Sequence, residues 1–197
     1  MELSSILSGL MAVLLLSSFV KIFTSLTILR YGLGLETASF GVVIAGVSLA
    51  LSLAIISPQL DKVGGVGVVF GATSNLNEEN LDKSFRPFLE KHTSPELHTK
   101  LVQLVSKHQE TTETAPKDSF ALLIASFLIS QLKEAFQLGF LILIPFLVID
   151  LLVTNILMVL NITQMSQAAV ALPFKILLFF VVDGWSLLSE KLISSYF

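Results

Sequence analysis

The chain has 197 residues, a hydrophobic fraction of 53%, a charged fraction of 14% and a mean hydropathy of +0.82. Soluble domains carry about 25% charged residues, so this composition is typical of a membrane protein rather than of a soluble domain. The net charge of −3 excludes the clustered basic surface of a nucleic-acid-binding protein. The absence of cysteine excludes disulfides, thiol catalysis and thiolate metal sites.

The first twenty residues predict a helix that is retained in the mature chain. A secretory signal peptide has a positively charged leader and a cleavage site of small residues. Here the sequence turns apolar at Ile6, and Glu2, the one charge before Lys21, has the opposite sign. We therefore expect residues 3–20 to remain as a helix.

Charged residues are concentrated in the middle of the chain. Seven of the 12 Lys/Arg residues, nine of the 15 Asp/Glu residues and all three histidines lie between Asp61 and Asp118. Residues 3–20 and 37–60 carry no charge. This segregation predicts an all-α, multi-span membrane protein, with about four long hydrophobic helices arranged as hairpins. A small helical polar domain would separate the second helix from the third.

A spanning helix needs about 20 apolar residues, and four segments meet this length. The expected spans are Leu3 to about Arg30, Phe40 to Ser57 with Pro58 as terminator, Phe120 to about Leu160, and Ala168 to about Ser189. We accordingly divide the chain into a first helix pair (1–60), a polar insert (61–118) and a second helix pair with its connecting loop (119–197).

The polar insert is predicted to contain two short amphipathic helices. Leu81, Phe85, Phe88 and Leu89 repeat at helical spacing. A second helix would start with Ser94 as N-cap, followed by Pro95 and Glu96 in the first turn. Its expected apolar face consists of Leu97, Leu101, Leu104, Val105 and His108, and residues 111–117 form a linker. The hairpin has little apolar surface, so we expect it to pack against the membrane domain or partner chains.

Four charged residues lie within or beside the apolar segments: Lys21, Asp150, Lys175 and Asp183. A charge at mid-bilayer costs about 3 kcal/mol or more, so such residues usually face a partner or a cavity. Either lysine could instead extend its ammonium to the membrane interface. The short aspartates cannot, which favours partnered burial for them. Pro145 and Pro173 interrupt helical hydrogen bonding, so the third and fourth segments are expected to be buried in an oligomer.

Other signals do not indicate an enzyme or a metal site. His92, His98 and His108 are not spaced as a helical pair of ligands. No Lys-Ser/Thr follows the glycines of residues 64–67, which excludes a phosphate-binding loop. Glu134 and Asp150 would lie about 24 Å apart on one helix, too far for paired acid–base catalysis. We expect no catalytic residues, no metal and no cofactor.

Three groups of motifs resemble the SctR/FliP family of type III export-apparatus proteins. The first group is Phe19-Val20-Lys21, Leu29-Arg30 and Gly32-Leu33-Gly34-Leu35. The second is Ala135-Phe136, Leu138-Gly139-Phe140 and the run from Ile144 to Leu151, and the third is Leu172-Pro173-Phe174-Lys175 with Asp183-Gly184-Trp185. The resemblance covers about residues 19–57 and 120–190 and leaves the polar insert unmatched.

The resemblance implies a pore-forming core subunit of the export gate, which passes unfolded proteins across the bacterial inner membrane. Family members form a homo-pentamer that joins SctS/FliQ-like and SctT/FliR-like membrane subunits, together with larger export-gate and switch subunits. The assembled complex would project to the periplasmic side, as would the polar insert. Nucleic acid is not an expected partner.

The resemblance also implies site residues. The family's methionine-rich loop, which closes the pore, corresponds here to Asn161, Ile162, Thr163, Gln164 and Met165. Only Met165 keeps the soft apolar side chain that suits a gasket, so we expect a wetter constriction. The expected inter-subunit polar contacts are Lys175, Gln131, Asp150, Lys21 and Asp183. Gln131 occupies the position of a family carboxylate that pairs with Lys175, and Ser39 replaces an expected proline.

Two other functions compete with the export gate. One is a proton- or solute-coupled transporter that uses Asp150 and Lys175 as a relay, although such transporters usually have repeated halves and none is visible. The other is a structural membrane scaffold. The closing sequence Trp185-Ser186-Leu187-Leu188-Ser189 favours a virulence-associated injectisome over a flagellum.

Overall fold

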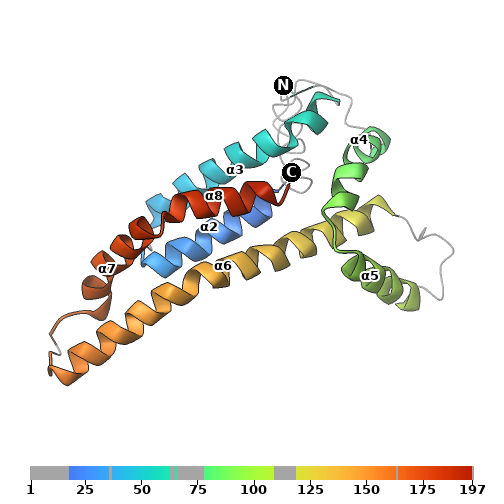
Figure 1. The fold of residues 1–197 in the computed structure, drawn as a ribbon. Helices are drawn as coiled ribbons and strands as arrows, with labels where there is room; N and C mark the ends of the chain where they lie inside the picture. The colour runs from blue at the N-terminus through green and yellow to red at the C-terminus, as the bar shows by residue number, and fades with distance from the viewer. Residues whose placement is uncertain are drawn as a thin grey trace. The chain divides into compact units, whose positions relative to one another are not determined.

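The computed structural model describes residues 18–35, 37–62, 65, 78–108, 119–162 and 164–196. All regular structure in these ranges is helical (Figure 1). The helices are α2 (Phe19–Leu33), α3 (Ala38–Asp61), α4 (Glu78–Lys91), α5 (Pro95–His108), α6 (Phe120–Val159), α7 (Gln167–Val181) and α8 (Gly184–Ser194). The predicted all-α fold is confirmed.

Two of these helices are long and apolar enough to cross a membrane by themselves. They are Ser39–Asp61 and Phe120–Val159, and α7 with α8 forms a third, bent candidate. The predicted multi-span membrane protein is therefore confirmed. The first expected span, Leu3 to Arg30, lies partly outside the described residues, and α2 is its described end.

The described chain divides into two compact units. One comprises the described parts of Met1–Lys21 and Leu49–Glu134, and the other comprises Ile22–Ser48 and Ala135–Phe197. The boundaries fall within α2, α3 and α6. This division follows contacts, whereas the three-part division at residues 60 and 118 follows hydropathy and stays a prediction.

Helix α3 continues past the proline that was expected to end it. It runs through Pro58 to Asp61. A proline inside a helix lacks the N–H group that would bond to the carbonyl four residues earlier, which is that of Ala54. The Ser57 hydroxyl donates to this carbonyl at 3.1 Å. The prediction that the helix stops at Ser57 was wrong because a side chain satisfies the freed carbonyl in the last turn.

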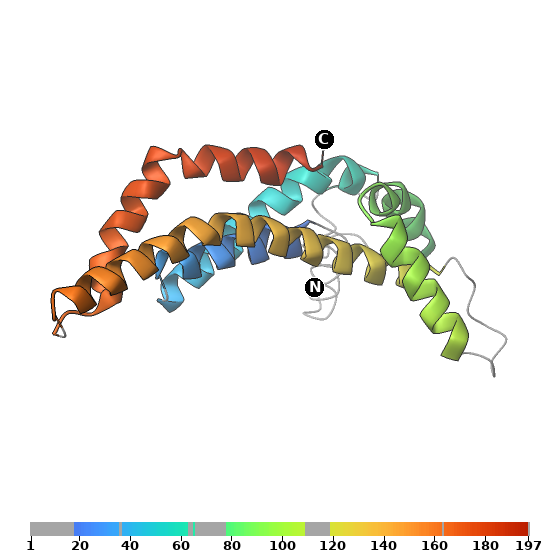
Figure 2. The ribbon, with the colours of Figure 1, turned by 60° about the horizontal axis from the view of Figure 1, so that its bottom comes forward.

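The fourth expected span is two helices rather than one. Helices α7 and α8 are bent by 61° (Figure 2). Between them Asp183 adopts a left-handed conformation with a φ of 49°. The buried Gly184 follows, and a Cβ there would overlap the ring of Phe179. The single helix expected from Ala168 to Ser189 was wrong because an Asp-Gly step, a common turn signal, interrupts it.

Helix α4 of the insert buries most of the face that its hydrophobic spacing predicted, whereas Leu104 on the expected apolar face of α5 is 56% exposed. Phe85, Phe88 and Leu89 of α4 are buried. The Phe88 ring lies 6.0 Å from that of Phe127 on α6, measured between centroids. Helix α5 begins at Pro95, directly after the predicted N-cap Ser94. The first part of α6 thus forms one side of the core of this unit.

In the other unit two glycines allow close helix packing. A Cβ on Gly32 would lie 2.9 Å from the Phe146 ring, and a Cβ on Gly139 would overlap Ile28. Both positions therefore need a residue without a side chain for α2 and α6 to approach. The buried Phe146 also lies 6.5 Å from Phe179 between ring centroids, which connects α6 to α7.

Candidate functional site

Lys175 of α7 connects three helices through its ammonium group. Its Nζ lies 2.7 Å from Asp150 Oδ2 on α6 and donates at 2.9 Å to the carbonyl of Gly32 on α2. Gly32 belongs to the last turn of its helix, where carbonyls have no intrahelical partner. A cation there also complements the negative end of the helix dipole. The lysine, which is 6% exposed, is therefore satisfied inside the chain.

An open cavity of about 420 Å³ adjoins this ion pair. Tyr31, Asp150, Gln167 and Lys175 are among its lining residues. The Gln167 amide donates at 3.1 Å to the backbone carbonyl of Asp150. The carboxylate of Asp150 keeps partial exposure, so the pair is buried on its lysine side and reachable on its aspartate side.

Lys21 of α2 is paired with Glu134 of α6. The lysine is 1% exposed, and its Nζ donates to Glu134 Oε2. The carboxylate is 45% exposed, so this pair too has one buried member and one open member. Of the two alternatives for Lys21, the structure shows partnered burial rather than extension to an interface.

A polar seam continues along the same part of α6. The Gln131 amide donates to the His92 carbonyl at 3.1 Å, and the Ser130 hydroxyl accepts from the Ser94 backbone N–H at 2.9 Å. The Ser126 hydroxyl lies 3.0 Å from His98 Nδ1. These bonds join α6 to the turn between α4 and α5 and to the start of α5. In this chain Gln131 therefore connects α6 to the turn between α4 and α5 in the polar insert.

The pKa of His92 is lowered below its ordinary value of 6.5. Burial is the main cause because it disfavours the charged ring, and the nearby Lys91 and Lys21 act in the same direction. Glu134 partly opposes them. The neutral imidazole, whose ring is tilted against that of Phe88 at 4.7 Å between centroids, is thus favoured by the folded insert.

The loop expected to form the constriction follows α6 and is exposed. Asn161, with a φ of 52°, ends that helix, and the Ile162 N–H closes its last turn by donating to Leu157 at 3.0 Å. Ile162, Gln164 and Met165 are exposed, whereas Thr163 lies outside the described residues. The Ser166 hydroxyl then caps α7 by accepting from the Ala169 N–H. The described residues of the loop thus leave the apolar side chains of Ile162 and Met165 uncovered in the single chain.

The structure brings some of the predicted polar residues together and leaves others apart. Lys175 meets Asp150, but Gln131 bonds to the insert rather than to Lys175. Asp183 is exposed and makes no capping hydrogen bond to α8. Sequence reasoning missed Glu134 as the partner of Lys21. The available signal was charge balance, since α6 carries two carboxylates in apolar surroundings and two lysines needed partners.

The described residues do not form a metal site. Among them no three His, Asp or Glu side chains are grouped to hold an ion. The two described histidines, His92 and His98, make the contacts given above, and the side chain of His108 lies outside the described residues. The arrangement consists of paired charges between helices and an exposed interhelical loop.

These features define a multi-span helical membrane protein whose buried lysines, Lys21 and Lys175, are neutralised by carboxylates of one long helix. Residues 2–192 match the model of the FliP family. The chain belongs to this family, which makes it a membrane subunit of a type III or flagellar export apparatus and not an enzyme.

The sequences of individual relatives align with almost the whole chain. The probable translocation protein y4yL of Sinorhizobium fredii is 34% identical over 94% of this chain and 87% of its own length. The flagellar biosynthetic protein FliP of Agrobacterium fabrum is 29% identical over 93% and 76%, respectively. The virulence protein YscR of Salmonella typhimurium is 33% identical over 91% and 87%. Flagellar and virulence-related proteins are thus both represented.

Proposed function

We propose that this chain is the pore-forming core subunit of a type III protein export gate, which passes unfolded proteins across the bacterial inner membrane. In this proposal five copies form a ring with SctS/FliQ-like and SctT/FliR-like membrane subunits. Larger export-gate and switch subunits would join the assembled ring.

The observation that carries the proposal is the apolar surface that the single chain leaves uncovered. Large exposed side chains follow the second half of α6 and continue into the loop: Leu147, Val148, Leu151, Leu152, Ile156, Met158, Ile162 and Met165. Lipid or other subunits must cover such a surface. The polar break in the loop is tolerated at membrane depth only if it is buried in protein or lines a wet cavity. The two or three candidate spans in the described part of the chain cannot enclose a path for a polypeptide, so a pore needs several copies.

Unshielded charge is not the reason for assembly. Lys21, Lys175, Asp150 and Gln131 have partners within the chain, so a ring is not required to neutralise them. The proposed role of the two ion pairs at subunit contacts depends on their carboxylates. Those of Glu134 and Asp150 are partly exposed and so remain accessible to a neighbouring copy. The exposed Asp183 is also available to such a neighbour.

Copy number is the test of this proposal. The chain would be co-expressed with the small membrane subunits encoded beside it, extracted in mild detergent and weighed by native mass spectrometry. We expect five copies per complex. Monomers that persist in the presence of the partners would contradict the ring.

A coupled transporter is the second candidate, and the open cavity beside the Asp150–Lys175 pair is the observation that favours it. The same experiment separates the two functions, because a transporter would appear as a monomer or a two-fold dimer. Lys175 is buried and donates a hydrogen bond to a carbonyl in the last turn of α2. These contacts suit a structural role better than proton relay, so we prefer the export gate.

We further propose an injectisome rather than a flagellum, on the closing sequence from Trp185 to Ser189. The names of the relatives include both systems and do not decide. Deletion of the gene in its own organism should abolish secretion of effector proteins and leave swimming in soft agar unchanged. Loss of swimming would assign the chain to a flagellum.

The polar insert would lie on the periplasmic side. Because the chain has no cysteine, a single Lys100→Cys variant on α5 can be labelled selectively. A maleimide that cannot cross the inner membrane should react with this variant in spheroplasts. Reaction only after membrane disruption would place the insert in the cytoplasm.

A further inference from the structure

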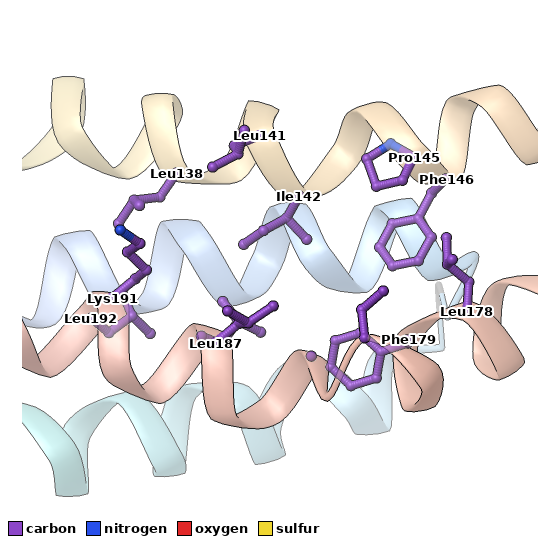
Figure 3. Close-up of a pocket in the computed structure, with 13 residues that line it drawn as sticks. Leu138, Leu141, Ile142, Pro145, Phe146, Leu178, Phe179, Leu187, Lys191 and Leu192 are labelled. Carbon is purple, nitrogen blue, oxygen red and sulfur yellow. The ribbon is translucent and has the colours of Figure 1, made fainter.

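An apolar groove lies between α6 and α8, with a cavity of about 280 Å³ (Figure 3). Leu138, Leu141 and Ile142 line it from α6, and Leu187 lines it from α8. The bend after α7 directs α8 along α6 and so creates the groove. The buried ring of Phe179 lies at the opposite end of the groove from Leu138 (Figure 3).

Lys191 is the one charged side chain among the residues that line this groove. Its amine lies beside Leu138 at one end, whereas Pro145 and Phe179 lie at the other (Figure 3). No carboxylate of the described residues lines the groove to neutralise it. The groove therefore has a cationic end and an apolar body.

We propose that this groove binds one acyl chain of an anionic phospholipid, with the lipid phosphate at Lys191. From Leu138 to Pro145 the α6 wall is about 10 Å long at 1.5 Å per residue. A helix is about 10–12 Å wide with its side chains, so a helix of another subunit cannot enter a cavity of this size. An alkyl chain is narrow enough, and basic residues beside membrane helices attract anionic headgroups.

The protein carries its own probe for this site. Trp185 is the single tryptophan of the chain, and its ring lies edge-on to Phe179 at 5.4 Å between centroids. A brominated acyl chain in the groove would therefore quench its fluorescence. The full chain would be reconstituted in phosphatidylcholine vesicles with increasing phosphatidylglycerol, and bromine would be placed on one lipid or the other.

The expected result is that brominated phosphatidylglycerol quenches Trp185 more strongly than brominated phosphatidylcholine. The relative binding constant derived from the titration should favour phosphatidylglycerol by roughly fivefold, which is the effect of one lysine near the membrane surface. Lys191→Glu should remove this preference, whereas Lys100→Glu on α5 should keep it. Leu187→Phe, which fills the groove, should weaken quenching by both lipids. The matched change Leu177→Phe, at an exposed position that does not line the groove, should have no effect.

Equal quenching by the two lipids in the unaltered protein would overturn the proposal, as would a preference that survives in Lys191→Glu. The alternative is a second copy of the chain that covers the mouth of the groove from outside without entering it. Efficient cross-linking between copies through Leu187→Cys, without any lipid preference, would show that arrangement instead. Circular dichroism of each variant checks that helical content is retained. If Lys191→Glu misfolds, the comparison of Leu187→Phe with Leu177→Phe still tests whether lipid binds in the groove.

Discussion

Lys175 and Asp150 form an ion pair of 2.7 Å between α7 and α6, and the lysine ammonium also donates a hydrogen bond to the carbonyl of Gly32 at the end of α2. The pair therefore determines how three helices meet, in addition to neutralising charge in an apolar region. Removing one member of a buried ion pair leaves the other without compensation. This relationship leads to the first prediction.

Asp150→Asn and Lys175→Ala should each destabilise the protein by about 3–5 kcal/mol and lower the yield of assembled complex. The reason is the uncompensated charge or the unsatisfied carbonyl that each leaves. Urea unfolding in detergent, followed by size-exclusion chromatography of the complex, measures both effects. Lys91→Ala, at an exposed position, is the control, and equal yields from Lys175→Ala and Lys91→Ala would contradict the assigned role.

Glu134→Ala should destabilise the protein by about 1–3 kcal/mol, because it leaves the buried ammonium of Lys21 without its carboxylate. Lys133→Ala changes the neighbouring exposed position and should have little effect. The two unfolding midpoints in urea provide the comparison. Similar midpoints would mean that Lys21 is satisfied without Glu134.

These two pairs also show how far the sequence could predict the site. Periodicity predicted α4 and α6 well, because α4 buries an apolar face and α6 is long and apolar enough to span a membrane. It also predicted α5, although Leu104 on the expected apolar face of that helix is exposed. The charges in apolar segments were identified, and Lys175 and Asp150 were singled out together. Their pairing within one chain was not predicted, since it depends on how α7 folds back on α6.

Other features were missed because short-range chemistry overrides hydropathy. The run from Ala168 to Ser189 is apolar enough for one helix, and only the Asp183-Gly184 step indicates the bend. Pro58 suggested an end to α3, but the Ser57 hydroxyl satisfies the carbonyl that the proline frees. Such local hydrogen bonds and turn conformations cannot be predicted from the hydrophobic pattern alone.

Gly139→Ala should destabilise the protein by about 1–3 kcal/mol, because the new methyl group would overlap Ile28 in a packed core. Gly46→Ala is the matched control, since a Cβ there meets no atom within 4 Å. This control should be neutral or stabilising by up to about 1 kcal/mol, as alanine favours helix. Thermal unfolding of both variants tests the prediction, and equal destabilisation would contradict close packing at Gly139.

The stability of the insert should decrease as pH falls below about 6.5. The pKa of His92 is lowered in the folded state, so below that pH the unfolded chain takes up a proton that the folded chain does not. The loss of stability grows as the pH falls towards the lowered pKa and then levels off. Hydrogen exchange of α4 and α5, corrected for intrinsic rates, should show this loss between pH 7 and pH 5.5. His92→Gln should flatten the profile, and an unchanged profile would exclude His92 as its source.

The loop residues should control leak through the assembled complex. Replacing Thr163 and Gln164 with methionine should lower ion leak in whole cells, because an apolar gasket excludes water. Replacing Ile162 and Met165 with glycine should raise it. If neither pair of changes alters leak or secretion, the constriction is built by a partner chain.

Contact between this loop and a protein in transit tests the central claim most directly. Because the chain has no cysteine, Met165→Cys introduces a single thiol at the exposed loop, and Lys100→Cys introduces one in the insert as a control. A secreted substrate stalled by a folded domain and carrying one cysteine would be oxidised in place with the assembled complex. We predict a disulfide between the substrate and Met165→Cys and none with Lys100→Cys. An assembled, secreting complex in which the stalled substrate never cross-links to Met165→Cys would contradict a pore lined by this chain.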